Sequence, residues 1–296
     1  MFTMIKKTLA ALLAVALVLA FAGCASAPAP ASSAAAPESS AAAGSDAASS
    51  EALTDLKVGF CPGPYGDLWK QAIAPQLEEK GYKIEYVEFS DYVQPNLALA
   101  NKEINVNLFQ HSIYLKNFSE EHKLELSLVT EVPTVSMGIW SNTTTSLTEL
   151  KKGAVVTIPN DETNQARGLR VLEAAGVITL KAGIDKSKAI PEDIDANPYE
   201  IQLVPTEAPQ IPRTLDSADL AVVNGNFAVA AGLDPATSLY NEVLAEGYVN
   251  VIAVRTEDFE KQFVKDIKDA ATNDIFKGII NDPANGYSGF QKPGNW

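Results

Sequence analysis

The stretch TIPNDETNQARGLRVLEAAG, residues 157–176, joins the end of an apolar strand to a helix that carries an arginine. Residues 154–158 are mostly β-branched, and Pro159 ends this strand because proline cannot donate to a sheet ladder. Helix-capping residue types follow, and apolar residues then recur at a helical spacing up to Gly176. The sequence therefore predicts a strand, a polar turn and a helix whose first or second turn holds Arg167.

This position gives Arg167 two possible roles. Unpaired backbone N–H groups at a helix N-terminus favour an anion, and a guanidinium beside them can bind a carboxylate through two hydrogen bonds. The alternative is a surface arginine that pairs with Asp161 or Glu162. This stretch alone leaves both readings open.

The first 23 residues have the pattern of a secretory signal peptide. Lys6 and Lys7 precede an apolar run over residues 9–21, which is too short to span a bilayer as a mature helix. Cys24 follows Ala22 and Gly23 in a sequence that resembles a lipobox, where a bacterial signal is cut before a lipidated cysteine. We expect a lipid anchor such as palmitate at Cys24; an uncleaved anchor over residues 9–21 would also leave the protein outside the membrane.

Residues 24–52 predict a lipidated cysteine followed by a disordered tether. After Cys24 this segment is almost entirely Ala, Ser, Pro and Gly, so it has no large apolar side chain to bury. A flexible coil of this length has an r.m.s. span on the order of 30 Å. The tether would let a folded part move while the lipid holds its start.

Composition excludes several function classes. The chain has 296 residues and a formal net charge of −14, which disfavours nucleic acid as a partner. Cys61 is the one cysteine after Cys24, so no internal disulfide is expected. With only His111 and His122 in the chain, a zinc site of ordinary spacing is not expected, and no cofactor is predicted.

The folded part alternates strands and helices. Residues 56–60 predict a strand, residues 67–80 a helix and residues 84–89 a second strand, with Gly and Pro turns between them. Such a βαβ opening, repeated later in the chain, argues for α/β layers around mostly parallel sheets.

Ring-bearing side chains follow a predicted strand over residues 104–111. Phe109, His111 and Tyr114 lie within six positions, and aromatic rings give large contact area at small cost in side-chain entropy. They can line one wall of a pocket. An ordinary core cluster, with His111 hydrogen-bonded to backbone, remains the alternative.

Two extended stretches suggest a chain that crosses between two lobes. Residues 132–140 and residues 248–255 flank an insert of about 110 residues, as a two-lobe protein with a hinge requires. We predict lobe 1 from residues 53–136 plus 256–296, and lobe 2 from residues 137–255. Within the insert, a buried strand over residues 220–223 ends at Asn224.

Several motifs together resemble the methionine-binding lipoproteins that feed ABC importers. In chain order they are Val58-Gly59-x-x-Pro62-Gly63-Pro64, Asp91-Tyr92-Val93-x-Pro95-Asn96, Asn107-x-Phe109-Gln110-His111-x-x-Tyr114-Leu115, Ile158-Pro159-Asn160-Asp161-x-x-Asn164-x-x-Arg167, Gln210-Ile211-Pro212-Arg213 and Asp219-Leu220-Ala221-Val222-Val223-Asn224. They run in order over nearly all of residues 56–296. Each motif is weak alone, and their combination is specific.

The resemblance implies an α/β fold of the two-lobe type II periplasmic-binding-protein kind, with a ligand cleft between the lobes. Arg167 would bind the carboxylate of methionine, with Asn164, Asn224 and Asn250 around its amino and carboxylate groups. Tyr92, Phe109, His111 and Tyr114 would surround the thioether, since sulfur–aromatic contacts are favourable. Arg170 carries the same charge on the same helix but matches no binding position of the family.

The implied function is a lipid-anchored, non-enzymatic binding protein on the extracytoplasmic face of the cell membrane. Its partners would be methionine or a close analogue and a membrane ABC permease with its ATPase. Residues 135–140 lack an acidic residue that many members carry, and Tyr65 stands where histidine is frequent. These departures leave L-methionine, D-methionine and a methionine-containing dipeptide open. The alternative from another class is an exported hydrolase that uses Cys61 or a serine with His111, although no Gly-x-Ser-x-Gly elbow is present.

Overall fold

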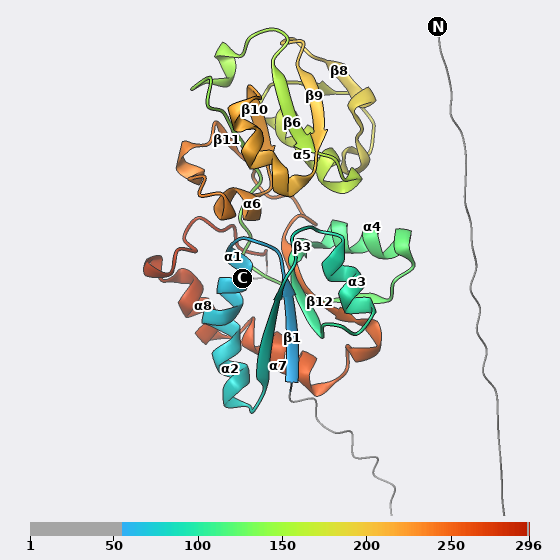
Figure 1. Ribbon diagram of the computed structural model, residues 1–296, viewed down its shortest axis with the longest axis vertical. Helices are drawn as coiled ribbons and strands as arrows, with labels where there is room; N and C mark the ends of the chain where they lie inside the picture. Colours follow the sequence, from blue (N-terminus) through green and yellow to red (C-terminus); the bar gives the residue numbers. More distant parts are fainter. Residues whose placement is uncertain (1–54, 295) are drawn as a thin grey trace, which may run out of the picture. The chain divides into compact units, whose positions relative to one another are not determined.

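The computed structural model describes residues 55–294 and 296, which build two five-stranded sheets. The first sheet has the order β2-β1-β3-β12-β4, of which Figure 1 labels β1, β3 and β12. Its strands are β1 (Asp55–Phe60), β2 (Lys83–Glu88), β3 (Val106–His111), β4 (Leu126–Glu131) and β12 (Asn250–Arg255). Strand β1 runs parallel to β2 and β3, while β12 is antiparallel to β3 and β4.

The second sheet has the order β11-β5-β10-β6-β9. Its strands are β5 (Gly138–Trp140), β6 (Val155–Pro159), β9 (Gln202–Thr206), β10 (Leu220–Val223) and β11 (Tyr240–Asn241). Strand β6 is parallel to both β9 and β10, whereas β5 is antiparallel to β10 and β11. A separate two-stranded sheet pairs β7 (Thr179–Leu180) with β8 (Ile194–Ala196).

Helices connect the strands, as the alternating sequence pattern predicts. The α-helices are α1 (Pro64–Leu68), α2 (Ala74–Glu79), α3 (Gln94–Ala100), α4 (Ser112–His122), α5 (Glu162–Ala174), α6 (Gly225–Ala230), α7 (Gln262–Ala270) and α8 (Asp274–Asn281). A π-helical turn, η1 (Trp69–Ile73), joins α1 to α2, and the longest 3₁₀ helix is η5 (Ala208–Asp216). The first helix begins three residues earlier than the expected Asp67, because Pro64 suits the first helical turn, where no N–H is needed. No helix in the described part of the chain is long and apolar enough to cross a membrane.

Each large sheet has its own hydrophobic core. Trp69, Leu77 and Ile267 are fully buried in the cluster that covers the first sheet. Ile158, Leu169 and Leu172 are fully buried in a cluster of the second sheet, where α5 packs against β6. Two separate cores are what a two-lobe α/β fold requires, since each lobe buries its own apolar face.

One strand lies in a different lobe from the one expected. The predicted division assigns residues 137–255 to lobe 2, yet β12 (Asn250–Arg255) pairs with β3 and β4 of the first sheet. The return crossing therefore precedes Asn250. All six residues of β12 are buried, so its apolar pattern fits either sheet, and only its long-range pairing decides which one it joins. The predicted signal peptide and tether, residues 1–52, lie outside the described residues.

Candidate functional site

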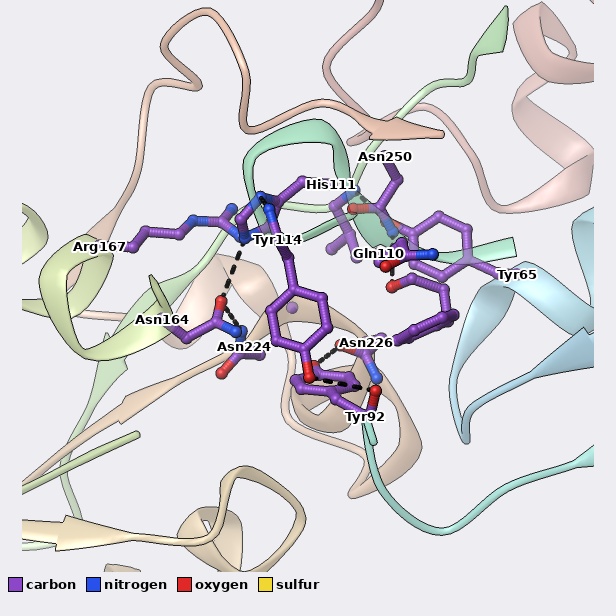
Figure 2. A pocket seen from close by; sticks show the side chains of 13 residues that line it. Tyr65, Tyr92, Gln110, His111, Tyr114, Asn164, Arg167, Asn224, Asn226 and Asn250 are labelled. Atoms are coloured by element: carbon purple, nitrogen blue, oxygen red, sulfur yellow. Dashed lines mark hydrogen bonds between the residues drawn. The ribbon is translucent and has the colours of Figure 1, made fainter. Parts of the chain in front are cut away.

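Side chains from both sheets and their helices line a cavity with an empty volume of about 330 Å³, open solvent included. All eight predicted binding residues line it: Tyr92, Phe109, His111, Tyr114, Asn164, Arg167, Asn224 and Asn250. Tyr65, Gln110, Val135, Gly225 and Asn226 complete the lining. In Figure 2, Arg167 and Tyr65 approach the cavity from opposite sides.

Arg167 reaches the cavity from the first turns of α5, as the sequence predicts. Asp161 caps this helix by accepting a hydrogen bond from the backbone N–H of Asn164 at 2.9 Å. Arg167 is only 4% exposed, so the reading as a surface arginine paired with Asp161 or Glu162 is wrong. A buried guanidinium requires a partner, and here it finds one far away in the sequence.

That partner is Glu242, which was not among the residues predicted from the sequence. Arg167 donates from Nε to both carboxylate oxygens of Glu242, at 3.1 and 3.0 Å, and from Nη2 at 2.6 Å. Burial lowers the pKa of Arg167, but the Glu242 carboxylate more than offsets this and the net shift is upward. Arg167 is therefore firmly cationic. Glu242 follows a two-residue strand and has no periodic pattern around it, so the sequence carries no signal for this pair.

Asn164 organises a chain of hydrogen bonds beside Arg167 (Figure 2). Its Nδ2 donates to Asp161, at 3.0 and 3.2 Å, and its Oδ1 accepts from Nδ2 of Asn224 at 2.9 Å. Oδ1 of Asn224 is buried and has no hydrogen-bond partner among the described residues. An unpaired buried acceptor is costly, so this oxygen is suited to a donor group of a ligand.

His111 is neutral and belongs to the same chain of hydrogen bonds. Its Nδ1 accepts from the backbone N–H of Tyr114 at 3.2 Å, so the ring proton belongs on Nε2, which lies 3.3 Å from Oδ1 of Asn164. Burial, and then the nearby charge of Arg167, lower the pKa of His111 to about 3. The predicted strand end and its histidine are therefore confirmed in place, but His111 caps helix α4 directly instead of leading into a loop.

The low pKa of His111 predicts a specific acid sensitivity. Between pH 6.5 and about 3 the unfolded chain binds a proton at His111 that the folded chain does not bind. The free energy of unfolding should therefore fall as the pH drops through this window, by at most about 5 kcal/mol, and be unaffected above it. Urea denaturation of wild type and His111→Gln at pH 4 and pH 7 measures this. The variant should lose less stability in acid, whereas the exposed control His122→Gln should behave like wild type; equal acid losses in wild type and His111→Gln would contradict it.

Aromatic rings form a continuous wall of the cavity. Tyr92 lies 5.9 Å from Phe109, 5.9 Å from Tyr114 and 5.0 Å from Phe227, measured between ring centroids. Tyr92 also donates from its hydroxyl to Oδ1 of Asn226 at 2.6 Å. Because Tyr92 precedes α3 and Asn226 lies in the first turn of α6, this bond joins the two lobes at the cavity.

Asn250 enters the cavity from the first residue of β12. Its Nδ2 donates to the carbonyl oxygen of Phe109 at 3.1 Å, and its backbone N–H donates to the hydroxyl of Thr134 at 2.7 Å. Both crossing segments therefore meet at this residue. Gln110, which also lines the cavity, is held by a buried amide network with Asn96 and Asn107.

Arg170, to which the family resemblance gives no binding role, contacts a residue that packs against the cavity lining. Its guanidinium lies 4.7 Å from the ring centroid of Tyr248, and that of Arg167 lies 5.1 Å from the same ring. Tyr248 also lies 5.0 Å from the His111 ring and is 1% exposed. Tyr248 therefore packs against two residues that line the cavity, Arg167 and His111. Because the Arg170 guanidinium contacts the same ring, substitution of Arg170 would remove one of the contacts that hold Tyr248.

The described residues offer little for catalysis or metal binding. Cys61 is buried, and burial, with the charges of Asp91 and Glu88, raises its pKa well above the usual value. A thiol with a raised pKa is a poor nucleophile, which disfavours the hydrolase alternative at Cys61. Among residues 55–294 and 296, no cluster of three or more His, Cys, Asp or Glu could hold a metal ion.

Comparison with known proteins gives consistent matches over most of the chain. A family model described as NlpA lipoprotein matches residues 56–294. The D-methionine-binding lipoprotein MetQ of Salmonella typhi is 35% identical over 236 residues, covering 78% of this chain and 86% of that protein.

Solved structures of related proteins also match this chain over most of its length. A nutrient-binding protein from Burkholderia cenocepacia bound to methionine has 34% identity and a TM-score of 0.73, over 78% of this chain and 98% of its own. Lipoprotein Tp32 from Treponema pallidum has 32% identity and a TM-score of 0.73, over 79% of this chain and 96% of its own. The fold predicted from the sequence resemblance, a two-lobe α/β fold, is confirmed by these neighbours together with the two sheets.

Proposed function

Because this chain belongs to the NlpA lipoprotein family, we propose that it captures methionine outside the membrane and delivers it to an ABC importer. The observation that carries this proposal is the buried guanidinium of Arg167 in a cavity lined by amides and aromatic rings. A guanidinium suits a carboxylate, amides suit both ends of an amino acid, and aromatic rings suit a thioether. The proposed role is binding, without a reaction.

In this proposal each cavity residue has a distinct task. Arg167 binds the ligand carboxylate, and the unpartnered Oδ1 of Asn224 accepts from the ammonium group. Asn164 and Asn250 complete the polar end of the site. The aromatic residues surround the methylthioether: Tyr92, Phe109, His111 and Tyr114.

A ligand held by residues of both lobes should favour the closed state, since it makes contacts there that an open cleft does not supply. L-methionine added to ligand-free protein should therefore raise the melting temperature and reduce the radius of gyration. Thermal shift and small-angle scattering measure these two effects, and mass spectrometry of molecules released from denatured protein identifies the natural ligand. Titration with D-methionine and a methionine-containing dipeptide separates the remaining ligand choices. A thermal shift without compaction would contradict a two-lobe clamp.

The membrane association of the protein is proposed to depend on Cys24. Relatives that match the chain are lipoproteins, and Cys24 lies in a lipobox-like sequence before the tether. Cys24→Ala should move the protein from the membrane to the soluble fraction in cell fractionation. Membrane retention unchanged by this substitution would instead assign the anchor to the apolar run of residues 9–21.

The partners follow from the same proposal. A lipid-anchored binding protein on the extracytoplasmic face would present its ligand to a membrane permease driven by a cytoplasmic ATPase. The two lobes would be built on the two sheets, with residues 53–136 and the C-terminal segment in lobe 1 and the following insert in lobe 2. Strand β12 joins lobe 1 in this division.

A further inference from the structure

Glu242 is a buried acid to which the proposed function gives no task. Its side chain is 8% exposed, and its Oε2 accepts from the backbone N–H of Met137 at 3.3 Å in addition to the bonds from Arg167. Its backbone is held as well, because its N–H donates to the carbonyl of Met137 at 2.9 Å and its carbonyl accepts from Nε2 of Gln291 at 2.6 Å. Glu242 is therefore fixed in place from several directions.

The Glu242 carboxylate accepts its hydrogen bonds from one edge of the Arg167 guanidinium. Nε and Nη2 donate to Glu242, whereas Nη1 makes none of the hydrogen bonds among the described residues. Since Arg167 lines the cavity, the edge with Nη1 is the one left for a ligand carboxylate. A bound carboxylate and Glu242 would then share one guanidinium, about 6 Å apart, as carboxylates on two edges of one fork must be.

The other described residues that line the cavity do not supply a second positive charge, and Arg170, which contacts the Tyr248 ring, lies outside the lining. His111 is neutral, and burial raises the pKa values of Tyr65, Tyr92 and Tyr114, so these hydroxyls stay uncharged at neutral pH. Asp161 lies behind Asn164 and is a further acid. Of the described residues that line the cavity, Arg167 is the single cation, and Glu242 already balances it.

The charge balance decides which ligands fit. A simple anion would place two carboxylates on one guanidinium and leave a buried negative charge without a partner, which is costly. A zwitterion brings its own ammonium group, and the unpartnered Oδ1 of Asn224 can accept from it. We propose that Glu242 makes the site select zwitterionic α-amino acids over the corresponding anionic acids; this inference rests on the proposed function.

The test compares L-methionine with its hydroxy analogue, 2-hydroxy-4-methylthiobutanoate, which has the same side chain and carboxylate but no ammonium. Calorimetric titration of the ligand-free full chain should give at least about 100-fold weaker binding of the hydroxy acid by wild type. Glu242→Gln keeps the shape of the side chain and removes its charge. In this variant the ratio of the two affinities, methionine over hydroxy acid, should fall by roughly 10- to 100-fold, as expected for the loss of one charge about 6 Å from the ligand carboxylate. Glu246→Gln is the matched control, because it makes the same change four residues away at an exposed position, and it should keep the wild-type ratio.

The outcomes separate this inference from the proposed function. Wild type that binds neither ligand overturns the proposed function, whereas wild type that binds both ligands equally overturns only the role of Glu242. An unchanged ratio in a folded Glu242→Gln also overturns it. If Glu242→Gln does not fold, Glu242→Asp decides: it retains the charge and should retain discrimination against the hydroxy acid, and loss of discrimination in that variant refutes the proposal.

Discussion

Replacement of Arg167 by alanine should weaken methionine binding by about 2–4 kcal/mol, or roughly 30- to 1,000-fold. Arg167 is buried at the cavity and paired with Glu242, so its loss leaves both a ligand carboxylate and a protein carboxylate without their cation. The unpaired Glu242 should also reduce the free energy of unfolding by about 3–5 kcal/mol. Calorimetric titration and urea denaturation measure the two effects separately.

A second variant separates the binding role of Arg167 from its support of the fold. Arg167→Met combined with Glu242→Met removes both charges, and replacing a buried ion pair by apolar residues is often neutral for stability. The double variant should regain most of the stability but none of the affinity. Arg213→Ala, which alters an arginine on η5 outside the cavity lining, is the control and should change both quantities by less than about 0.5 kcal/mol. Wild-type affinity in the double variant would show that Arg167 supports only the fold.

The second large effect is expected at Gly63, where the lobes touch beside the cavity. A Cβ at Gly63 would lie 2.6 Å from the backbone oxygen of Asn226 and 2.8 Å from its Cβ. Asn226 also donates from Nδ2 to the carbonyl of Pro62 at 3.0 Å, so the segment of Gly63 and that of Asn226 are held together here. Gly63→Ala should therefore hold the lobes apart and weaken methionine binding by about 1–3 kcal/mol, roughly 5- to 150-fold. Calorimetry gives the affinity, and small-angle scattering should show less compaction by ligand.

Backbone strain at Gly63 needs its own control, because its φ of +127° is itself unfavourable for alanine. Gly81 has a φ of +92°, and a Cβ added there would meet no atom within 4 Å, so Gly81→Ala adds strain without a lobe contact. Gly81→Ala should lower the melting temperature and leave methionine affinity unchanged. If Gly63→Ala also binds methionine like wild type, the contact with Asn226 does not control closure.

The local parts of the site could be predicted from sequence. Residues 154–176 contain a β-branched run, a proline, capping residues and an apolar stripe, and the structure confirms the strand, the turn and the helix that carries Arg167. These signals are local, because each reflects backbone geometry within a few residues. The βαβ opening is confirmed for the same reason.

The parts that depend on long-range pairing could not be predicted. Glu242 lies 75 residues from Arg167 in a segment without helical or strand periodicity, so nothing in the sequence pairs them. The sheet that β12 joins is likewise decided by pairing with β3 and β4, not by its own pattern. The environment of Arg170 depends on Tyr248, which approaches from the return crossing. Family resemblance gave the cavity residues their roles, which remain predictions until binding is measured.

The proposed function depends above all on the binding of a ligand carboxylate by Arg167 in this cavity. Titration of ligand-free wild type with L-methionine and with methioninol, which lacks the carboxylate, tests it most directly. We expect methionine to bind about 30- to 1,000-fold more tightly than methioninol, as the loss of one partner from a buried charge pair predicts. The double variant of Arg167 and Glu242 should bind the two ligands almost equally. Equal binding of methionine and methioninol by wild type, or a preference for methionine that survives in the double variant, would show that Arg167 does not bind the ligand carboxylate.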